Sequence, residues 1–382
     1  MRHQNSVLHD VLKRIPWDVF DRLVEQHRSD YRVRRLSTKD QFVAMLFGQL
    51  SGAASLREIT TAMESHRARL YHAGACPVQR STLADANAQR PSVVFAELFA
   101  TMVSRAHRGL RRAIGESVYL IDSTSVPLSG LSQDWACYSA KVCGAKLHMI
   151  YDPDADQPIY AAITPSRRND IAEAQQMPIE PGATYVFDLG YYDYGWWARM
   201  ADDGCRIVTR FKRNTQLAVV AELPLPKGST ILSDRIGHLP ERQCRNRHNP
   251  FQDPVREVRV TTETGKVLRI LTNDLDASAQ EIADLYKRRW AIELFFRWVK
   301  QALEIRHFLG TSENAVRIQI IVALIAFLLL RLAQAAQSVV KTPLAFARLV
   351  RANLMHRRRI DRLLDPGTPS SQDHRQIAIQ WN

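Results

Sequence analysis

The sequence lacks the patterns that mark several common classes of protein. Its five cysteines are an odd number with no C-x-x-C pair, which argues against a disulfide framework or a structural zinc site and predicts ordinary core thiols. No P-loop, dinucleotide-binding glycine motif or G-x-S-x-G elbow occurs, so ATP hydrolysis and serine-hydrolase chemistry are not indicated. His356 and Arg359 form an H-x-x-R fragment like that of tyrosine recombinases, but no tyrosine nucleophile follows it.

Long hydrophobic runs are also missing. The longest, residues 320–330, has eleven residues, whereas a helix needs about 20 to cross a bilayer. This run therefore predicts a buried helix. The amino terminus has no apolar segment of the signal-peptide type, so the protein is expected in the cytoplasm, without a membrane partner.

Negative charge is scarce relative to positive charge. The chain has 52 Lys and Arg against 39 Asp and Glu, a net charge of +13, and a pI near 9.7. The excess is uneven: residues 1–112 contain 18 bases and 10 acids, and residues 341–365 contain seven bases and two acids. A polyanionic partner is expected, nucleic acid before an anionic membrane, although a basic surface can also serve solubility alone.

Residues 1–112 have helical periodicity throughout, with apolar side chains three and four residues apart. Ser55 and Glu58 form a capping box, and after a turn at residues 74–77 Ser81 is expected to cap a short polar helix. Two short helices and a turn in a basic all-α region are compatible with a helix-turn-helix DNA reader and also with an ordinary helical bundle.

From residue 116 the period changes to that of strands, and the pattern of strands and helices predicts a mixed α/β sheet. A β-rich segment follows, with a hairpin turning at Thr264 and Gly265, and it separates the sheet from the next helix. Residues 366–376 resemble a flexible tail. The expected strands are 116–122, 145–152, 158–166, 184–188 and 205–212, and the expected helices are 169–177 and 194–203.

The stretch YKRRWAIELFFRWVKQ, residues 286–301, has a single acid, Glu293, among five basic residues. It belongs to a predicted helix that begins near Ser278, where Glu281 completes a capping box. At 100° per residue its polar side chains share an arc of about 80°, and the apolar side chains lie elsewhere. On its own this stripe is also compatible with a solvated face of ion pairs. The residues on the stripe are Tyr286, Arg289, Glu293, Arg297 and Lys300.

Two aspartates, Asp122 and Asp188, each end a predicted hydrophobic strand, which is where open α/β sheets place their sites. If the two strands are neighbours, these carboxylates can share a metal ion, with Glu293 as a third ligand. Oxygen ligands without His or Cys suit Mg²⁺ or Mn²⁺. A lone aspartate at a strand end is more often a turn former or a helix cap.

These motifs together resemble the DDE transposases of the insertion sequence 4 family. The segments YLIDSTSV and YVFDLGYY resemble the surroundings of the family's two aspartates, and the third acid lies in the signature Y-x2-R-x3-E-x6-K. A β-rich insertion before the last helix is also typical of this family. The signature residues are Tyr286, Arg289, Glu293 and Lys300.

The resemblance implies an α/β protein with a ribonuclease-H-like mixed sheet, a β-rich insertion and a preceding all-α domain. Residues 1–112 would be the helical DNA-binding domain, 113–212 and 278–340 the catalytic core, 213–277 the insertion, and 341–382 a basic C-terminal segment and tail.

The resemblance also implies a chemistry. Asp122, Asp188 and Glu293 would be catalytic and bind two Mg²⁺ ions, with Mn²⁺ as a substitute, about 3.5 to 4 Å apart for an in-line displacement at a phosphodiester. Tyr286 and Lys300, with Arg289, would contact phosphates near the cut. The partners would be double-stranded DNA, as terminal inverted repeats and target, and a second copy of the chain. The setting would be a bacterial cytoplasm, at the nucleoid.

Other residues near the stripe are weaker candidates for DNA contact. Trp290 and Trp298 could stack a base flipped out of the duplex, or could be core packing on an amphipathic helix. Lys146, Arg210 and Arg297 could contact DNA, since each is basic and lies on or near the predicted site.

Two alternative functions remain open at this stage. One is a catalytically silent, transposase-derived DNA-binding protein or repressor, which the intact set of three acids disfavours. The other is a stand-alone nuclease of the same fold, which the Tyr-Arg-Lys signature and the basic ends disfavour.

Overall fold

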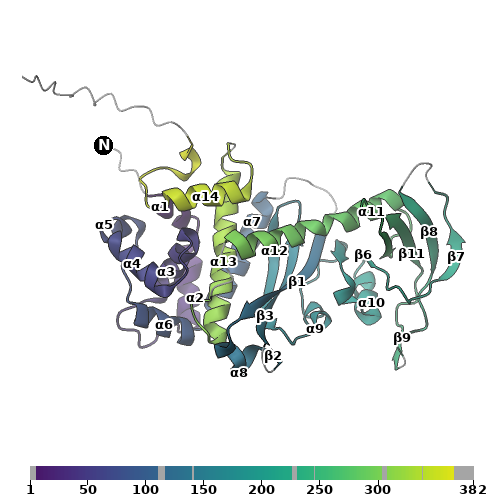
Figure 1. Ribbon diagram of the computed structural model, residues 1–382, viewed down its shortest axis with the longest axis horizontal. Helices are drawn as coiled ribbons and strands as arrows, with labels where there is room; N and C mark the ends of the chain where they lie inside the picture. Colours follow the sequence, from purple (N-terminus) through teal and green to yellow (C-terminus); the bar gives the residue numbers. More distant parts are fainter. Residues whose placement is uncertain are drawn as a thin grey trace, which may run out of the picture.

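The computed structural model describes residues 6–110, 117–139, 142–225, 230–244, 246–302, 308–337 and 339–364. Three parts follow one another along its longest axis: the helices of the N-terminal third, a mixed sheet, and a β-rich part at the far end (Figure 1). The long helix α13 (Glu313–Ala335) lies between the N-terminal helices and the sheet, and contacts both.

The N-terminal third is helical, as its periodicity predicts. The Ser55 hydroxyl accepts a hydrogen bond from the Glu58 amide at the start of α4, which confirms that cap. The prediction for Ser81 is wrong, because α6 begins at Arg80, one residue earlier, and has no side-chain cap. The helices are α1 (Val7–Leu12), α2 (Trp17–Gln26), α3 (Thr38–Ser51), α4 (Leu56–Ser65), α5 (Arg67–Leu70), α6 (Arg80–Gln89) and α7 (Val93–Leu110).

The helices α4 and α6 do not form the helix-turn-helix that the sequence left open beside an ordinary helical bundle. The helix α5 and the 3₁₀ turn η1 (Tyr71–Ala73) lie between them, where the motif has a turn of about three or four residues.

The apolar run at residues 320–330 is buried within α13, as predicted. By length and composition alone this helix could cross a membrane, but 83% of its most apolar window is buried inside the protein. It packs against α3, α6, α7 and α14 (Pro343–Asn353), so it serves as the core helix that joins the N-terminal helices to the sheet.

The central sheet is mixed, as predicted. Strand β1 pairs antiparallel with β3 on one side and parallel with β5 on the other, and β5 pairs parallel with β6. The predicted hairpin of β3 and β4 is present. The elements are β1 (Val118–Leu128), β2 (Cys137–Ser139), β3 (Val142–Asp152), β4 (Gln157–Pro165), α9 (Asp170–Ala174), β5 (Thr184–Phe187), α10 (Tyr194–Asp202) and β6 (Arg206–Arg210).

The β-rich segment extends this sheet. Its strand β12 pairs antiparallel with β6, which makes one ten-stranded sheet. The predicted hairpin of β11 and β12 is present, and Gly265 at its turn has a φ of 76°, which glycine adopts without strain. The strands are β7 (Ala218–Glu222), β8 (Ile231–His238), β11 (Val255–Thr261) and β12 (Val267–Thr272), beside a small ribbon of β9 (Arg242–Cys244) and β10 (Arg247–His248).

The helix predicted from Ser278 onward is two helices, α11 (Ala279–Arg288) and α12 (Trp290–Ala302). Ser278 caps α11 through the Glu281 amide, as expected. The interruption falls at Arg289, whose amide bonds to the Tyr286 carbonyl in a tighter, 3₁₀-like turn.

All five cysteines are free thiols. Cys143 and Cys205 are buried, as expected of core thiols, but Cys76 and Cys244 are exposed. The expectation failed for these two because Cys76 precedes α6 in an irregular segment and Cys244 lies in the small β9–β10 ribbon. The tail predicted at residues 366–376 lies outside the described residues.

Candidate active site

The first two acids of the candidate site lie side by side on neighbouring strands. Strands β1 and β5 are parallel, and Ile121 is paired with Phe187. The next residue on each strand is an aspartate, so Asp122 and Asp188 leave the paired region at the same level. Asp188 then caps the 3₁₀ turn η3 (Leu189–Tyr191), where its carboxylate accepts a hydrogen bond of 2.8 Å from the Gly190 amide.

Asp122 does not end its strand, contrary to the sequence prediction. Strand β1 continues to Leu128, because its residues after Asp122 remain paired with β3 although β5 has ended. Asp122 therefore lies where the parallel pairing stops, on a strand that continues beyond it. This leaves its carboxylate largely buried, with 16% of the side chain exposed.

The third acid, Glu293, reaches the site from the first turn of α12. Arg289 joins it to the sheet: one guanidinium nitrogen lies 3.3 Å from Asp122 Oδ2 and another contacts Glu293 Oε1. The acids on β1 and on α12 thus share one cation. Of the helix stripe noted in the sequence, Arg289 and Glu293 thus face Asp122, whereas Arg297 is exposed.

The electrostatics of the site reflect this crowding of acids. The pKa of Asp122 is raised to about 7, chiefly by burial and also by the nearby Asp188 and Glu293. The hydrogen bond from the Ser123 amide and the charge of Arg289 oppose the rise. The crowding of negative charge around Asp122 favours a bound cation, because added positive charge relieves the repulsion that helps to raise its pKa.

The residues present fit a divalent metal in their donor chemistry, since all three side chains offer oxygen and suit Mg²⁺ or Mn²⁺. Their present arrangement is not a ready coordination sphere: within the described ranges, no three His, Cys, Asp or Glu side chains are placed to hold an ion together. The Arg289 guanidinium lies between Asp122 and Glu293 and contacts both carboxylates.

The other residues of the signature surround Arg289. Tyr286 is buried, with 8% exposed, and its ring lies 5.8 Å from the Arg289 guanidinium carbon. Burial raises the pKa of the Tyr286 hydroxyl, while Arg289 and Arg210 lower it, so both cations lie near the hydroxyl. Lys300 lies half-buried in the last turn of α12.

The two tryptophans of α12 differ in environment. Trp290 is 51% exposed, and the Arg297 guanidinium lies 5.7 Å from its ring centre. Trp298 instead packs edge-on against Phe327 of α13, with ring centres 4.8 Å apart. Trp290 is thus accessible to a stacked base, whereas Trp298 is part of the core packing.

A fourth carboxylate, Asp170, lies next to the site and was missed by sequence reasoning. Its Oδ1 accepts hydrogen bonds from Ser123 Oγ at 2.8 Å and from Lys146 Nζ at 3.1 Å. A Cβ on Gly190 would lie 3.0 Å from Asp188 Oδ1 and 3.5 Å from Asp170 Oδ2, so the glycine lets the two carboxylates approach. Lys146, expected at the DNA, is therefore engaged by Asp170.

His148 completes this group from β3. It is fully buried, with Nδ1 3.6 Å from Asp170 Oδ1 and Nε2 2.8 Å from Thr164 Oγ1. Burial lowers the pKa of His148 to about 4, so it is neutral near pH 7. No local motif marks Asp170, because its contact with Ser123 depends on how α9 folds back against β1 and β3.

Comparison with known families identifies two regions. A family model described as "Transposase DDE domain" matches residues 114–329, which span all three acids. A second model, described as "Domain of unknown function (DUF4372)", matches residues 3–76.

Similar proteins are known in bacteria. A protein of Sinorhizobium fredii named as transposase y4zB is 41% identical over 303 residues, covering 78% of this chain and 83% of its own length. A protein of Geobacillus stearothermophilus named as the transposase of insertion sequence element IS5377 is 32% identical over 263 residues, 66% of each chain.

Among solved structures, the cryo-EM structure of a piggyBac transposase synaptic complex with hairpin DNA aligns with 94% of this chain and 80% of its own. The TM-score is 0.45 and the identity 13%, too distant for the two sites to be compared.

Proposed function

Because the chain belongs to the DDE transposases of insertion-sequence type, we propose that it performs cut-and-paste transposition with Asp122, Asp188 and Glu293 as its catalytic residues. It would bind the ends of its element, cut them, and join the freed 3′-hydroxyls to target DNA. The signature Y-x2-R-x3-E-x6-K supports placing it with the insertion sequence 4 type.

One observation carries this proposal. Three acids that are far apart in the sequence approach one another from β1, η3 and α12, and one arginine of the signature bridges two of them. A structural ion pair would need only one acid for Arg289. A cluster of three carboxylates, with further bases on the same helix, suits a site for metal ions and phosphates.

The residues of the chain would divide the work as follows. Asp122, Asp188 and Glu293 would hold divalent ions, two of them by the proposed mechanism, with Mg²⁺ native and Mn²⁺ a substitute. Bound there, the ions would activate the attacking water or 3′-hydroxyl and stabilise the leaving oxygen. Arg289, released from the acids, would bind a phosphate beside the cut together with Lys300.

Other parts of the chain would hold the DNA. Trp290 has the exposure needed to stack a base taken out of the duplex, with Arg297 beside it. Arg210 would add charge near Tyr286. Cutting and joining need two ends held together, so we expect a homodimer with terminal repeats and target DNA at the nucleoid of a bacterial cell.

The substitution Glu293→Gln tests the role of the third acid. It keeps the size of the side chain and a hydrogen-bond acceptor for Arg289, but removes the charge that a metal requires. DNA affinity should stay within about threefold of wild type, since phosphate contacts dominate affinity, while cleavage should be lost.

The matched control is Asp284→Asn, which neutralises an exposed acid on α11 that accepts a hydrogen bond from Gln280. It should cleave like wild type. A gel-based assay measures cleavage and fluorescence anisotropy measures DNA affinity, both on one labelled duplex that carries the element's end. Equal cleavage by wild type and Glu293→Gln would contradict the assignment of Glu293 as a catalytic residue.

A further inference from the structure

A cluster of positive charge lies in the loop that joins α2 to α3, far from the three acids in the sequence. Four arginines occur within residues 28–35, which we call the arginine loop, and all four are exposed. Tyr31 between them is 67% exposed. The helices that the loop joins lie at the end of the molecule opposite the β-rich part (Figure 1). The four arginines are Arg28, Arg32, Arg34 and Arg35.

The base of the arginine loop is fixed by buried polar contacts. Asp30 Oδ1 accepts hydrogen bonds of 2.7 Å from both the amide and the hydroxyl of Thr38, at the start of α3. The Ser29 hydroxyl, which is buried, lies 2.7 Å from the Thr38 hydroxyl. Leu36 closes the loop as a buried side chain. The exposed tip is thus held on a rigid base.

Two of the arginines have backbone conformations that favour glycine. Arg28 has a φ of 49° and Arg32 a φ of 61°, in the left-handed region that most side chains avoid. Glycine would relieve this strain, yet both positions carry long cationic side chains. Backbone strain retained at two exposed cationic residues points to a use for their side chains. The one ring contact that the two make with other described residues is that of Arg32, whose guanidinium carbon lies 5.1 Å from the centre of the exposed Tyr31 ring.

The charges of the loop are not neutralised by the protein. Within the part of the chain that the structure describes, no ion pair joins any of the four guanidinium groups to a carboxylate, and the one acid of the loop, Asp30, is committed to Thr38. Two exposed arginines on helices of the same third of the chain are paired, Arg22 with Asp18 and Arg67 with Glu64.

We propose that the arginine loop is a binding site for the phosphate backbone of duplex DNA. The choice of DNA as the polyanion rests on the proposed function. Guanidinium groups bind phosphates in a bidentate manner, and a rigid loop loses little conformational entropy when it binds. The site assigns a role to the region matched by the domain of unknown function, in which α4 and α6 do not form a helix-turn-helix.

Contacts to the backbone predict a particular behaviour. Phosphates carry no sequence information, so the arginine loop should add affinity for any duplex and set its position relative to the acids. Each phosphate contact contributes about 0.9 to the slope of log affinity against log salt concentration. Two arginines removed from the loop should therefore lower that slope by about 2.

The test is the double substitution Arg34→Gln/Arg35→Gln in the full chain, which leaves the two strained arginines in place. The control is Arg22→Gln/Arg67→Gln, which removes the same charge from paired sites. Fluorescence anisotropy across a salt series would use one labelled duplex from the element's end and one of scrambled sequence. We expect the loop variant to bind both duplexes roughly tenfold to a hundredfold more weakly at 0.1 M salt, and the control to bind like wild type.

Two results would overturn the arginine loop as a backbone site: equal affinity and salt slope for both variants, or a loss confined to the element's own end. A cleavage assay of the wild type distinguishes these two results from failure of the proposed function. If the wild type cuts element ends and the loop variant binds DNA normally, only the proposal for the arginine loop is contradicted. A wild type that binds no duplex at all removes both.

Discussion

At the scale of single residues, the site depends on how one arginine is shared. Arg289 contacts both Asp122 and Glu293, so any cation or phosphate that enters must compete for the same groups. A metal ion would compete with Arg289 for the two acids, and a DNA phosphate would compete with the acids for the Arg289 guanidinium. Binding of either one would free the group that the other needs. Binding of metal and DNA should therefore be mutually favourable at this site.

The raised pKa of Asp122 gives a prediction about stability without metal. A raised carboxyl pKa means that the folded protein keeps a proton that the unfolded chain has lost, so stability falls as the pH rises from about 4 to about 7. Asp122→Asn should remove this penalty. Its advantage in the free energy of unfolding should grow by about 2–3 kcal/mol between pH 5 and pH 8.

Urea unfolding in EDTA at the two pH values would measure this difference. The exposed Asp284→Asn serves again as control and should follow the wild type at both pH values. An advantage of Asp122→Asn that is the same at pH 5 and pH 8 would show that Asp122 does not have its raised pKa in the folded protein.

Sequence reasoning reached only part of the site. The spacing of Arg289 and Glu293, one helical turn apart, predicts that they meet, and they do. The level at which Asp122 and Asp188 meet depends on the register of β1 and β5, which the sequence suggested only through the two similar strand patterns. The place of Asp170 beside the site could not be predicted, because its partners Ser123 and Lys146 lie on two strands distant in sequence.

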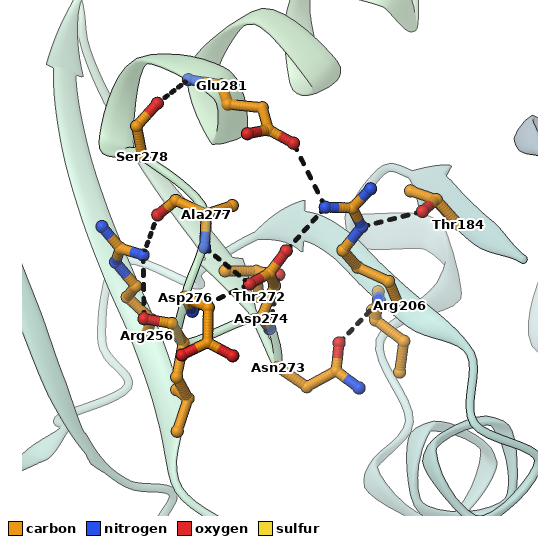
Figure 2. A network of polar contacts seen from close by, with 12 residues as sticks. Thr184, Arg206, Arg256, Thr272, Asn273, Asp274, Asp276, Ala277, Ser278 and Glu281 are labelled. Carbon is orange, nitrogen blue, oxygen red and sulfur yellow. Dashed lines mark hydrogen bonds and ion pairs between the residues drawn. The ribbon is translucent and has the colours of Figure 1, made fainter. Parts of the chain in front are cut away.

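At the scale of elements, α11, which leads into Arg289 and α12, is anchored to the sheet by the turn at residues 273–278 (Figure 2). Arg206 of β6 contacts Asp274 at 2.6 Å and Glu281 of α11 at 3.3 Å, and donates to Thr184 of β5. Asp274 in turn accepts two amide hydrogen bonds within the turn. The start of α11 is thus tied to β5, the strand that leads into Asp188.

Arg256 of β11 also contacts the turn at residues 273–278. It makes a bidentate pair with Asp234 of β8, with both contacts 2.7 Å, and donates to the carbonyls of Leu275 and Ala277. Both charged side chains are almost fully buried. The β-rich segment therefore helps to position the helix of the site as well as extending the sheet.

The buried pair gives a prediction about this anchoring. Arg256→Met should lower the free energy of unfolding by about 3–5 kcal/mol, because it leaves the Asp234 carboxylate buried without a partner. The double substitution Arg256→Met/Asp234→Leu should be less destabilised than the single one, since both charges are then removed. Chemical unfolding of the three proteins measures this, and a single variant that loses less than about 1 kcal/mol would show that the pair does not support the turn.

The sequence predicted most elements of the sheet, because strand patterns and turn residues are local signals. It missed that β12 joins β6, since pairing between residues as far apart in the chain as Ile270 and Arg210 leaves no local mark. It also predicted one helix where Arg289 separates two. Arg289 contacts Asp122 of the sheet at this break, and helical periodicity does not record such a long-range contact.

At the scale of the whole molecule, β1, β5 and α12, the elements that place the three acids, lie between the helices joined by the arginine loop and the β-rich part (Figure 1). The core helix α13 and the shared sheet join these parts into one body. A duplex held on the arginine loop would be fixed relative to the acids, which is what a cut at a defined distance from a binding site requires.

The most direct test of a metal-dependent site formed by these acids is cleavage of a labelled duplex carrying the element's own ends. The reaction would be run with Mg²⁺, with Mn²⁺ and with EDTA, for the wild type and for Asp188→Ala. The expected result is cutting at the element boundary that needs either metal and vanishes in Asp188→Ala. Cutting that persists in EDTA or in the variant, or tight DNA binding with no cutting under either metal, would contradict it.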